Sequence, residues 1–238
     1  MNIFFLAWCV AECARAHFNR HVTKMIVEYA QILSTAHRML DSCSGLQLTE
    51  TELLAATHAN HPAMLWARAH VNNYRWLARL ALALCAEKTR RYGTPHSLEP
   101  TLRRLAQLEP RNIERRLDGV ALHFEPRVTM PPQCFGKEAH LRVDGDPVTG
   151  YRAYYASPSK RHLRWWRPTL RAQPLAEARR DDSVDYVPSW FAGIGGLADL
   201  SAPLYYLRAL EQPAERKRRR SAAAPGVDKR PRIAAAAE

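Results

Sequence analysis

CVAECARAHFNRHVTKMIVEYAQILSTAHRML, residues 9–40, is the stretch whose pattern decides the fold class. Its apolar side chains recur at helical spacing, and Gly45 follows as a stop signal. The apolar positions are Phe18, Val22, Met25, Ile26, Tyr29, Ile32 and Leu33. This periodicity predicts one long amphipathic helix over residues 9–40, with its apolar face buried in a core.

A stripe of polar side chains flanks the apolar face of the same helix. Its members are His17, His21, Lys24, Glu28, Gln31 and Thr35. At 100° per residue they lie within about 80° of arc, one above another. Two imidazoles, an amine and a carboxylate beside a core make a candidate acid/base wall. A boundary face stabilised by i,i+4 pairs would produce the same pattern.

A metal site is a further interpretation of this helix. Cys13, His17 and His21 are spaced i, i+4, i+8, and two histidines one turn apart can hold a metal ion. The chain has no HExxH motif and no pair of zinc-binding cysteines. We therefore expect ordinary packing and hydrogen bonding at these residues, with no metal and no other cofactor.

Working outward from this stretch, the sequence predicts further helices and few other regular elements. They are a short helix over 49–57 opened by a Thr49/Glu52 capping box, a helix with Pro62 in its first turn, and helices over 72–92, 98–108 and 146–155. We expect residues 2–6 to be extended, 110–145 to be loop, 169–186 to be an inserted loop, and VPSWF (187–191) to pack on the body. The predicted fold is mainly α, with a single helical domain over 1–210.

Composition bounds the class of protein. The 238 residues carry a net charge of +12, of which residues 211–238 account for +4 and residues 1–210 for +8. A basic body attracts polyanions, although moderate charge also serves solubility alone. Five cysteines, an odd number with no CxxC pair, indicate reduced thiols and an intracellular protein. The apolar start is short and lacks Lys or Arg, so we expect neither a signal peptide nor a membrane span.

Two segments combine aromatic and basic side chains as nucleic-acid-binding surfaces do. They cover residues 61–96 and 151–168. The candidate nucleic-acid contacts are His61, Trp66, Arg68, Arg91, Lys160, Arg161 and Arg164. The other interpretation places the rings in the core with arginine stems lying over them.

The C-terminal segment 211–238 is rich in Arg, Ala and Pro, and we expect it to be disordered. Its basic clusters at 215–220 and 229–232 are typical of a bipartite nuclear-import signal, which an import receptor binds. A nonspecific nucleic-acid tether is the alternative. Either role suits a DNA-associated protein in the nucleus or in a viral factory.

Several blocks together resemble an uncharacterised family found in bacteriophages and large DNA viruses. They are MNIFFL (1–6), AHFNRHVTKMIVEYAQILSTAHRML (16–40), HPAMLWAR (61–68), RYGTPH (91–96), GYRAYYASPSKR (150–161) and VPSWF (187–191). The resemblance covers most of residues 1–191 in order. It extends, more distantly, to the phage pyrimidine-dimer DNA glycosylases.

The resemblance implies an all-helical DNA repair enzyme. In that class the N-terminal α-amine attacks the sugar C1′, and a glutamate of the first long helix manages the intermediate. Here the amine would belong to Met1, while Lys24 falls about where the glutamate is expected and Glu28 lies one turn further on. Our hypothesis is a glycosylase/lyase in which Met1 attacks, Glu28 acts as acid/base and His17 and His21 assist. A non-catalytic nucleic-acid-binding protein is the main alternative, and a metal-dependent hydrolase is a third.

Overall fold

The computed structural model describes residues 1–42, 48–49, 51–116 and 127–160, together with Leu163, Pro188 and Trp190. These residues form helices and no strands, which confirms the mainly α fold class for this part of the chain. All of them belong to one compact unit, Met1–Gly193, and a second unit spans Ile194–Glu238. The predicted insertion at 169–186 and the predicted tail at 211–238 lie outside the described residues. None of the described helices combines the length and apolar character that a membrane span requires.

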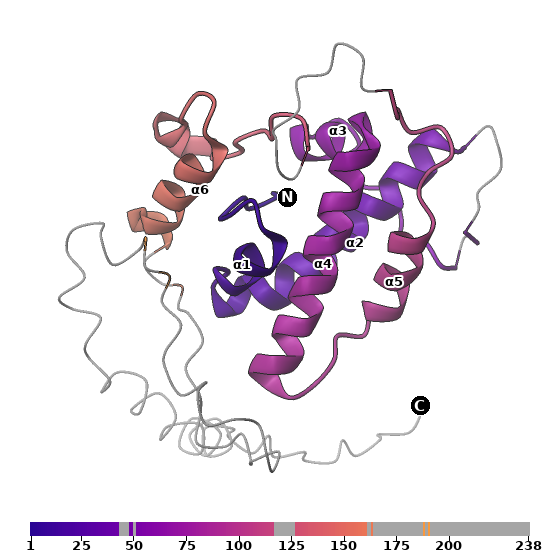
Figure 1. Cartoon of the computed structure of the whole chain (residues 1–238), viewed down its shortest axis with the longest axis horizontal. Coiled ribbons are helices and arrows are strands. Elements are labelled where there is room, and N and C mark those ends of the chain that lie inside the picture. Colours follow the sequence, from indigo (N-terminus) through magenta and orange to yellow (C-terminus); the bar gives the residue numbers. More distant parts are fainter. Residues whose placement is uncertain are drawn as a thin grey trace, which may run out of the picture. The chain divides into compact units, whose positions relative to one another are not determined.

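Two long helices, α2 and α4, pack against each other and organise the body (Figure 1). The shorter helices α1 and α5 pack on α4, and α3 packs on both long helices. The bounds are α1 Val10–Arg15, α2 Asn19–Leu40, α3 Pro62–Ala69, α4 Val71–Tyr92 and α5 Glu99–Gln107. Pro62 occupies the first turn of α3, and α4 ends at Gly93 with a φ of 70°, as the start and stop signals predict.

The N-terminal segment precedes the first helix, contains no helix or strand and is buried. Ile3, Phe4, Phe5 and Leu6 are each at most 5% exposed. Phe5 stacks on Trp76 of α4 with 4.2 Å between ring centroids, while the preceding ring, Phe4, stacks on His21 of α2 at 4.7 Å.

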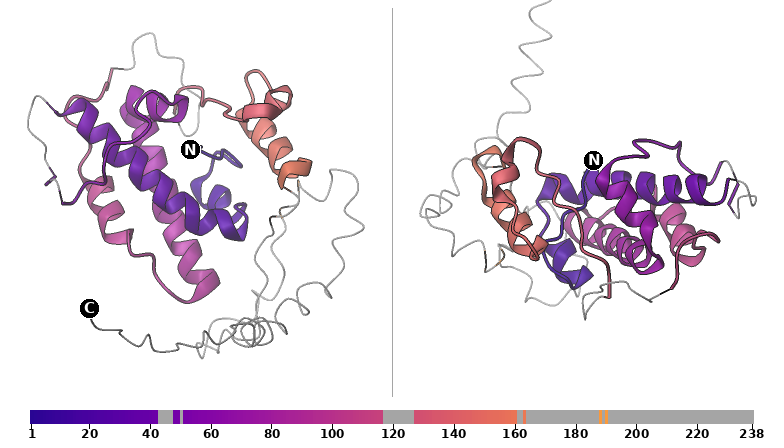
Figure 2. Two further views of the ribbon diagram at one scale, coloured as in Figure 1. Left: turned by 180° about the vertical axis from the view of Figure 1, so that it is seen from behind. Right: turned by 90° about the horizontal axis from the view of Figure 1, so that it is seen from above.

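Helix α6 (Pro147–Ala156) packs on the body through this segment. The indigo N-terminal residues lie between α6 and the other helices (Figures 1 and 2). The ring of Tyr151 contacts Phe4 edge to face at 5.8 Å, and the ring of Tyr155 stacks on Phe18 at 4.5 Å. Trp190 also packs against the core, with the Arg152 guanidinium 5.1 Å from its ring centroid, as expected for the VPSWF block.

The predicted continuous helix over 9–40 is wrong in one respect, because it is broken at residues 16–18 between α1 and α2. No glycine or proline marks the break. The guanidinium of Arg91 donates to the carbonyl oxygens of Arg15 and His17 at 2.8 and 2.9 Å. These bonds satisfy carbonyl groups that an uninterrupted helix would have bonded internally. A side chain from α4 thus stabilises the break.

The predicted helix over 49–57 is also wrong. The Thr49 N–H does donate to the Glu52 carboxylate at 2.8 Å, as in a capping box, but only a turn follows. The guanidinium of Arg38 on α2 donates hydrogen bonds to the carbonyl oxygens of Leu53 and Leu54 at 3.1 and 2.8 Å. Those carbonyls are therefore used by a tertiary contact rather than by helical hydrogen bonds.

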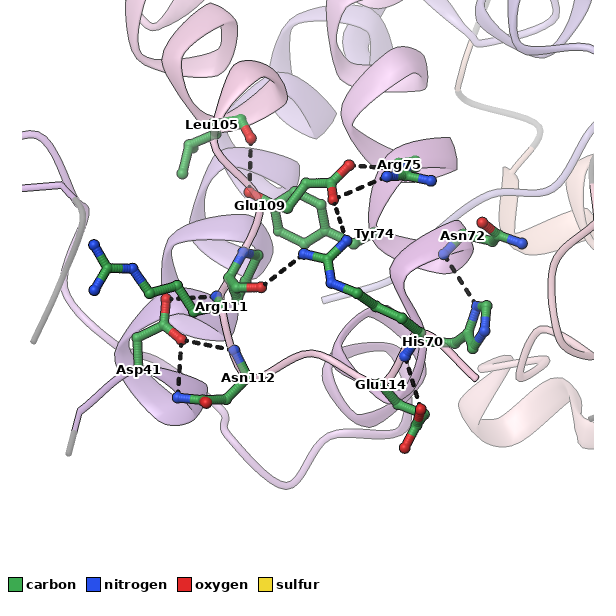
Figure 3. Close-up of polar contacts among 12 residues, drawn as sticks. Asp41, His70, Asn72, Tyr74, Arg75, Leu105, Glu109, Arg111, Asn112 and Glu114 are labelled. Atoms are coloured by element: carbon green, nitrogen blue, oxygen red, sulfur yellow. Dashed lines mark hydrogen bonds and ion pairs between the residues drawn. The ribbon is translucent and has the colours of Figure 1, made fainter. Parts of the chain in front are cut away.

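The connection after α5 is loop, as predicted, and polar contacts hold it in place (Figure 3). The buried carboxylate of Asp41, at the end of α2, accepts hydrogen bonds from the backbone N–H groups of Arg111 and Asn112 at 3.1 and 3.2 Å. Glu109 forms an ion pair with Arg75 of α4. Within the predicted loop 110–145, the described residues also contain a short 3₁₀ helix, η1 (Gly136–Leu141), which packs on α6.

Candidate functional site

A cavity of about 1140 Å³ opens where the N-terminal segment meets α2, the start of α3 and the segment 132–144. Residues of α6 and of the short 3₁₀ helix η2 (Pro158–Lys160) complete its wall. Half of the site residues predicted from the sequence line this one cavity. They are Met1, His21, Lys24, Glu28, His61 and Lys160.

Asn2 fixes the position of Met1 on the cavity wall. Its backbone N–H donates to Glu28 Oε2 at 3.1 Å, and its side-chain amide donates to the Cys134 carbonyl at 2.8 Å. The Tyr151 hydroxyl donates to Asn2 Oδ1 at 2.6 Å. With both its backbone and its side chain bonded, Asn2 leaves little freedom for the residue that precedes it.

Each oxygen of the Glu28 carboxylate has its own partner. Its Oε1 pairs with the Lys24 ammonium at 2.8 Å, and its Oε2 accepts the Asn2 N–H. The Glu28 side chain is 13% exposed and that of Lys24 is 61% exposed, so the pair spans from the wall of the cavity to solvent. Because the two residues are one helical turn apart, α2 alone brings them together.

His61 lines the same cavity from the N-terminus of α3. Its Nδ1 accepts the Ala63 N–H at 3.2 Å, which caps the helix. Burial lowers the pKa of His61, and the positive charge of the N-terminal amine lowers it further, while the charge of Glu28 acts in the opposite direction. His61 therefore lies within the electrostatic reach of both Met1 and Glu28.

His21 also lines the cavity. The ring stacks on Phe4 with 4.7 Å between centroids and an interplanar angle of 9°. Its Nδ1 forms a 2.6 Å hydrogen bond with the Tyr155 hydroxyl. These contacts hold the imidazole in place. Only 7% of His21 is exposed, so most of the residue is shielded from water.

His17 does not reach this cavity, although the sequence pattern groups it with His21. Its side chain is fully buried at the break between α1 and α2, where its Nδ1 contacts the Cys13 carbonyl at 2.7 Å. Burial lowers its pKa to about 4. The expectation that His17 assists a reaction is therefore corrected, because a neutral, buried imidazole away from the cavity serves the packing of the core.

Three of the predicted nucleic-acid contacts also serve the fold. Trp66 is 5% exposed, and its indole N–H donates to the Thr129 carbonyl at 3.0 Å, so its ring cannot stack on a base. Arg91 is 4% exposed and its Nε donates to Glu87 at 2.6 Å. Arg68 donates to the Ala59 carbonyl at 2.9 Å and lies outside the cavity wall. The remaining two, Arg161 and Arg164, lie outside the described residues.

Several residues of the cavity wall were not singled out from the sequence. They are Asn2, Cys134, Phe135, Lys137, Arg142 and Tyr154. Most of them belong to the segment 132–144, which has no periodic pattern and was interpreted only as loop. Tyr154 belongs to the segment 151–168, which combines aromatic and basic side chains. Its spacing along α6 from Tyr151 and Tyr155 is the one signal in the sequence that could have identified it. Burial raises the pKa of the Cys134 thiol.

No group of three or more His, Cys, Asp or Glu side chains within the described part of the chain is arranged to hold a metal ion. Cys13 and His17, two of the three residues considered for a metal, are engaged elsewhere. The Cys13 thiol donates to the Phe4 carbonyl at 3.1 Å, and burial raises its pKa to about 12.

Comparisons of the chain with known protein families, with curated proteins and with solved structures found no match.

Proposed function

We propose that the cavity is the active site of a DNA glycosylase and abasic-site lyase that uses an amine as its nucleophile. The observation that carries the proposal is the convergence of Met1, Glu28 and His61 from three separate segments on one cavity. Schiff-base chemistry requires an amine to attack and a nearby acid/base group to move protons. In this proposal the α-amine of Met1 is the nucleophile, and Glu28 supplies the carboxylate.

The reaction can be written with these groups alone. The lone pair of the Met1 amine forms a bond to the sugar C1′, and the C1′–N bond breaks with its electron pair leaving on the base, which takes up a proton. As the sugar ring opens, the C1′–O4′ bond breaks with its electron pair moving to O4′, which takes up a proton given by the nitrogen, and an imine between the nitrogen and C1′ results. Glu28 then accepts a proton from C2′, and the C3′–O bond breaks so that the phosphate leaves with the electron pair. Hydrolysis of the imine restores the amine.

In the proposed reaction the neighbouring groups have supporting parts. The Lys24 ammonium pairs with Glu28 Oε1 and holds the carboxylate toward the N-terminal segment. The backbone N–H of Asn2 holds the other oxygen, so that Glu28 and Met1 keep a constant separation. Lys160, on the far wall, supplies a positive charge for a DNA phosphate.

Trapping with borohydride tests the proposal, because reduction of the imine links protein and DNA permanently. The substrate is a duplex that carries an abasic site or has been irradiated with ultraviolet light, and intact mass first verifies that the protein begins at Met1. We expect the native protein to be trapped. One residue added before Met1, or Glu28→Gln, should abolish trapping and leave DNA binding largely intact. Glu12→Gln, an exposed carboxylate on α1, is the matched control.

Lys24 is one competing nucleophile in the same cavity, which Lys137 and Lys160 also line, and Lys24→Met separates Lys24 from Met1. Trapping that survives the extension at Met1 but is lost in Lys24→Met would assign the attack to Lys24. Peptide mapping of the trapped adduct gives an independent identification of the attacking residue.

The alternative function is a non-catalytic nucleic-acid-binding protein. The basic side chains of Lys137, Arg142 and Lys160 on the cavity wall favour it, as does the net charge of +8 on residues 1–210. Such a protein would bind DNA with an affinity that falls steeply with salt, since phosphate contacts release counterions. It would give no adduct with borohydride under any condition.

A further inference from the structure

Four rings follow one another along the cavity wall. His21 stacks on Phe4 at 4.7 Å, Phe4 is nearly parallel to Tyr154 at 6.5 Å, and Tyr154 stacks on Phe135 at 4.7 Å. The angles between successive planes are 9°, 24° and 24°. All four residues line the cavity. The step between Phe4 and Tyr154 is the widest of the three.

Tyr154 differs from the two other tyrosines of α6. Tyr151 and Tyr155 are at most 1% exposed, and each hydroxyl forms a hydrogen bond of 2.6 Å inside the protein. Tyr154 is only half-buried, and within the described ranges no residue forms a hydrogen bond with its hydroxyl. A large ring left on the wall of a cavity is a surface on which another flat ring can stack.

The ammonium of Lys160 lies 4.5 Å from the centroid of the Tyr154 ring. No carboxylate pairs with Lys160 in the part of the chain that the structure describes. Glu138, on the same wall, instead accepts hydrogen bonds from the hydroxyls of Ser157 and Ser159 at 3.2 and 2.8 Å. The contact of a partly solvated ammonium with a ring is weak and easily exchanged.

We propose that Tyr154 and Lys160 form a seat for a single nucleotide everted from DNA, with its base on the Tyr154 ring and its phosphate on Lys160. The base replaces the ammonium on the ring, and the displaced ammonium pairs with the phosphate attached to the same nucleotide. The exchange is favourable because stacking of a base on a tyrosine is stronger than an exposed contact between an ammonium and a ring. The proposal rests on the proposed function in that it takes DNA as the ligand of the cavity.

Binding of two matched probes tests the seat without any chemistry. One is a single-stranded thymidine decamer, and the other is a decamer of tetrahydrofuran abasic units with the same phosphates and no bases. We expect Tyr154→Leu to weaken binding of the thymidine decamer about tenfold and to leave binding of the abasic decamer unchanged. Tyr154→Phe should restore the affinity, since it keeps the ring. Tyr92→Leu, at an exposed tyrosine outside the cavity, is the control.

The salt dependence of binding separates the two halves of the seat. Lys160→Met should weaken binding of both decamers and reduce the slope of log affinity against log salt by about 0.7, the value for one phosphate contact on a single strand. Tyr154→Leu should leave that slope unchanged. Arg79→Met removes an exposed charge of α4 outside the cavity and should not show the full Lys160 effect.

The outcomes distinguish the seat from the lyase. Equal loss of both probes in Tyr154→Leu, or no loss of either, overturns the seat even if borohydride traps the native protein. A loss confined to the thymidine decamer supports the seat even if no adduct forms, in which case the cavity binds a nucleotide without reacting with it. Native protein that binds neither decamer overturns the seat, whereas borohydride trapping on duplex DNA tests the proposed function independently.

Discussion

Replacing Arg91 with methionine should destabilise the fold and leave the proposed DNA-binding cavity intact. The Arg91 side chain is fully buried, its Nε pairs with Glu87 at 2.6 Å, and its Nη1 also donates to Asn19 at 3.1 Å. Its other donors satisfy the carbonyl groups of Arg15 and His17. Removing one partner of a buried ion pair costs about 3–5 kcal/mol, because the other charge remains in the interior.

Urea unfolding followed by circular dichroism measures this loss. With a slope of about 2 kcal/mol per molar urea, a loss of about 4 kcal/mol moves the midpoint down by about 2 M. Arg79→Met, at an exposed arginine of the same helix, should change the free energy of unfolding by less than about 0.5 kcal/mol. Glu87→Gln should be destabilising as well, since it leaves the guanidinium buried without its counter-charge.

The result that would refute this reasoning is the opposite pattern. An Arg91→Met protein with native stability, weaker DNA binding and a salt slope reduced by about one contact would show that Arg91 binds a phosphate. Its buried position between α1, α2 and α4 would then not be the arrangement in solution.

Two further effects follow from buried groups of the helical body. His17 has a folded pKa of about 4 against an ordinary value of 6.5, so as the pH falls the unfolded chain binds a proton first. The free energy of unfolding should therefore fall by about 3 kcal/mol between pH 6.5 and pH 4 and level off below pH 4. His17→Gln should flatten that part of the pH profile. Asn2→Ala removes the hydrogen bonds to Cys134 and Tyr151 and should lower the rate of borohydride trapping well beyond its effect on DNA affinity. Asn112→Ala, on the loop after α5, should leave the trapping rate unchanged. An unchanged trapping rate in Asn2→Ala would show that Met1 needs no such anchor.

The local patterns of the sequence predict the elements that depend on neighbours within one or two turns. Apolar spacing identifies most of α2 and α4, and Pro62 and Gly93 mark the start of one helix and the end of another. The pairing of Lys24 with Glu28 follows from the same logic, since residues four apart share a face of any helix. These features are encoded within short stretches and hold wherever the helix packs.

Burial and tertiary contacts explain the errors. The break at residues 16–18 depends on Arg91, and the absent helix at 49–57 depends on Arg38. Each arginine comes from another helix and takes carbonyl groups that local signals assign to helical hydrogen bonds. The sequence pattern also groups Trp66 with the surface rings, whereas the packing of Phe5 and Trp76 places it in the core.

The sequence by itself determined the helical class, the basic charge of the body and the polar stripe on α2 that supplies one wall of the cavity. Only the tertiary structure decided which of the stripe's residues reach the cavity and what stands opposite them. Asn2 forms hydrogen bonds with Cys134 and Tyr151, which lie 132 and 149 residues further along the chain, so no periodic pattern predicts these contacts. Periodicity records which face of a helix is apolar, whereas the partner of that face is selected by the packing of the whole core.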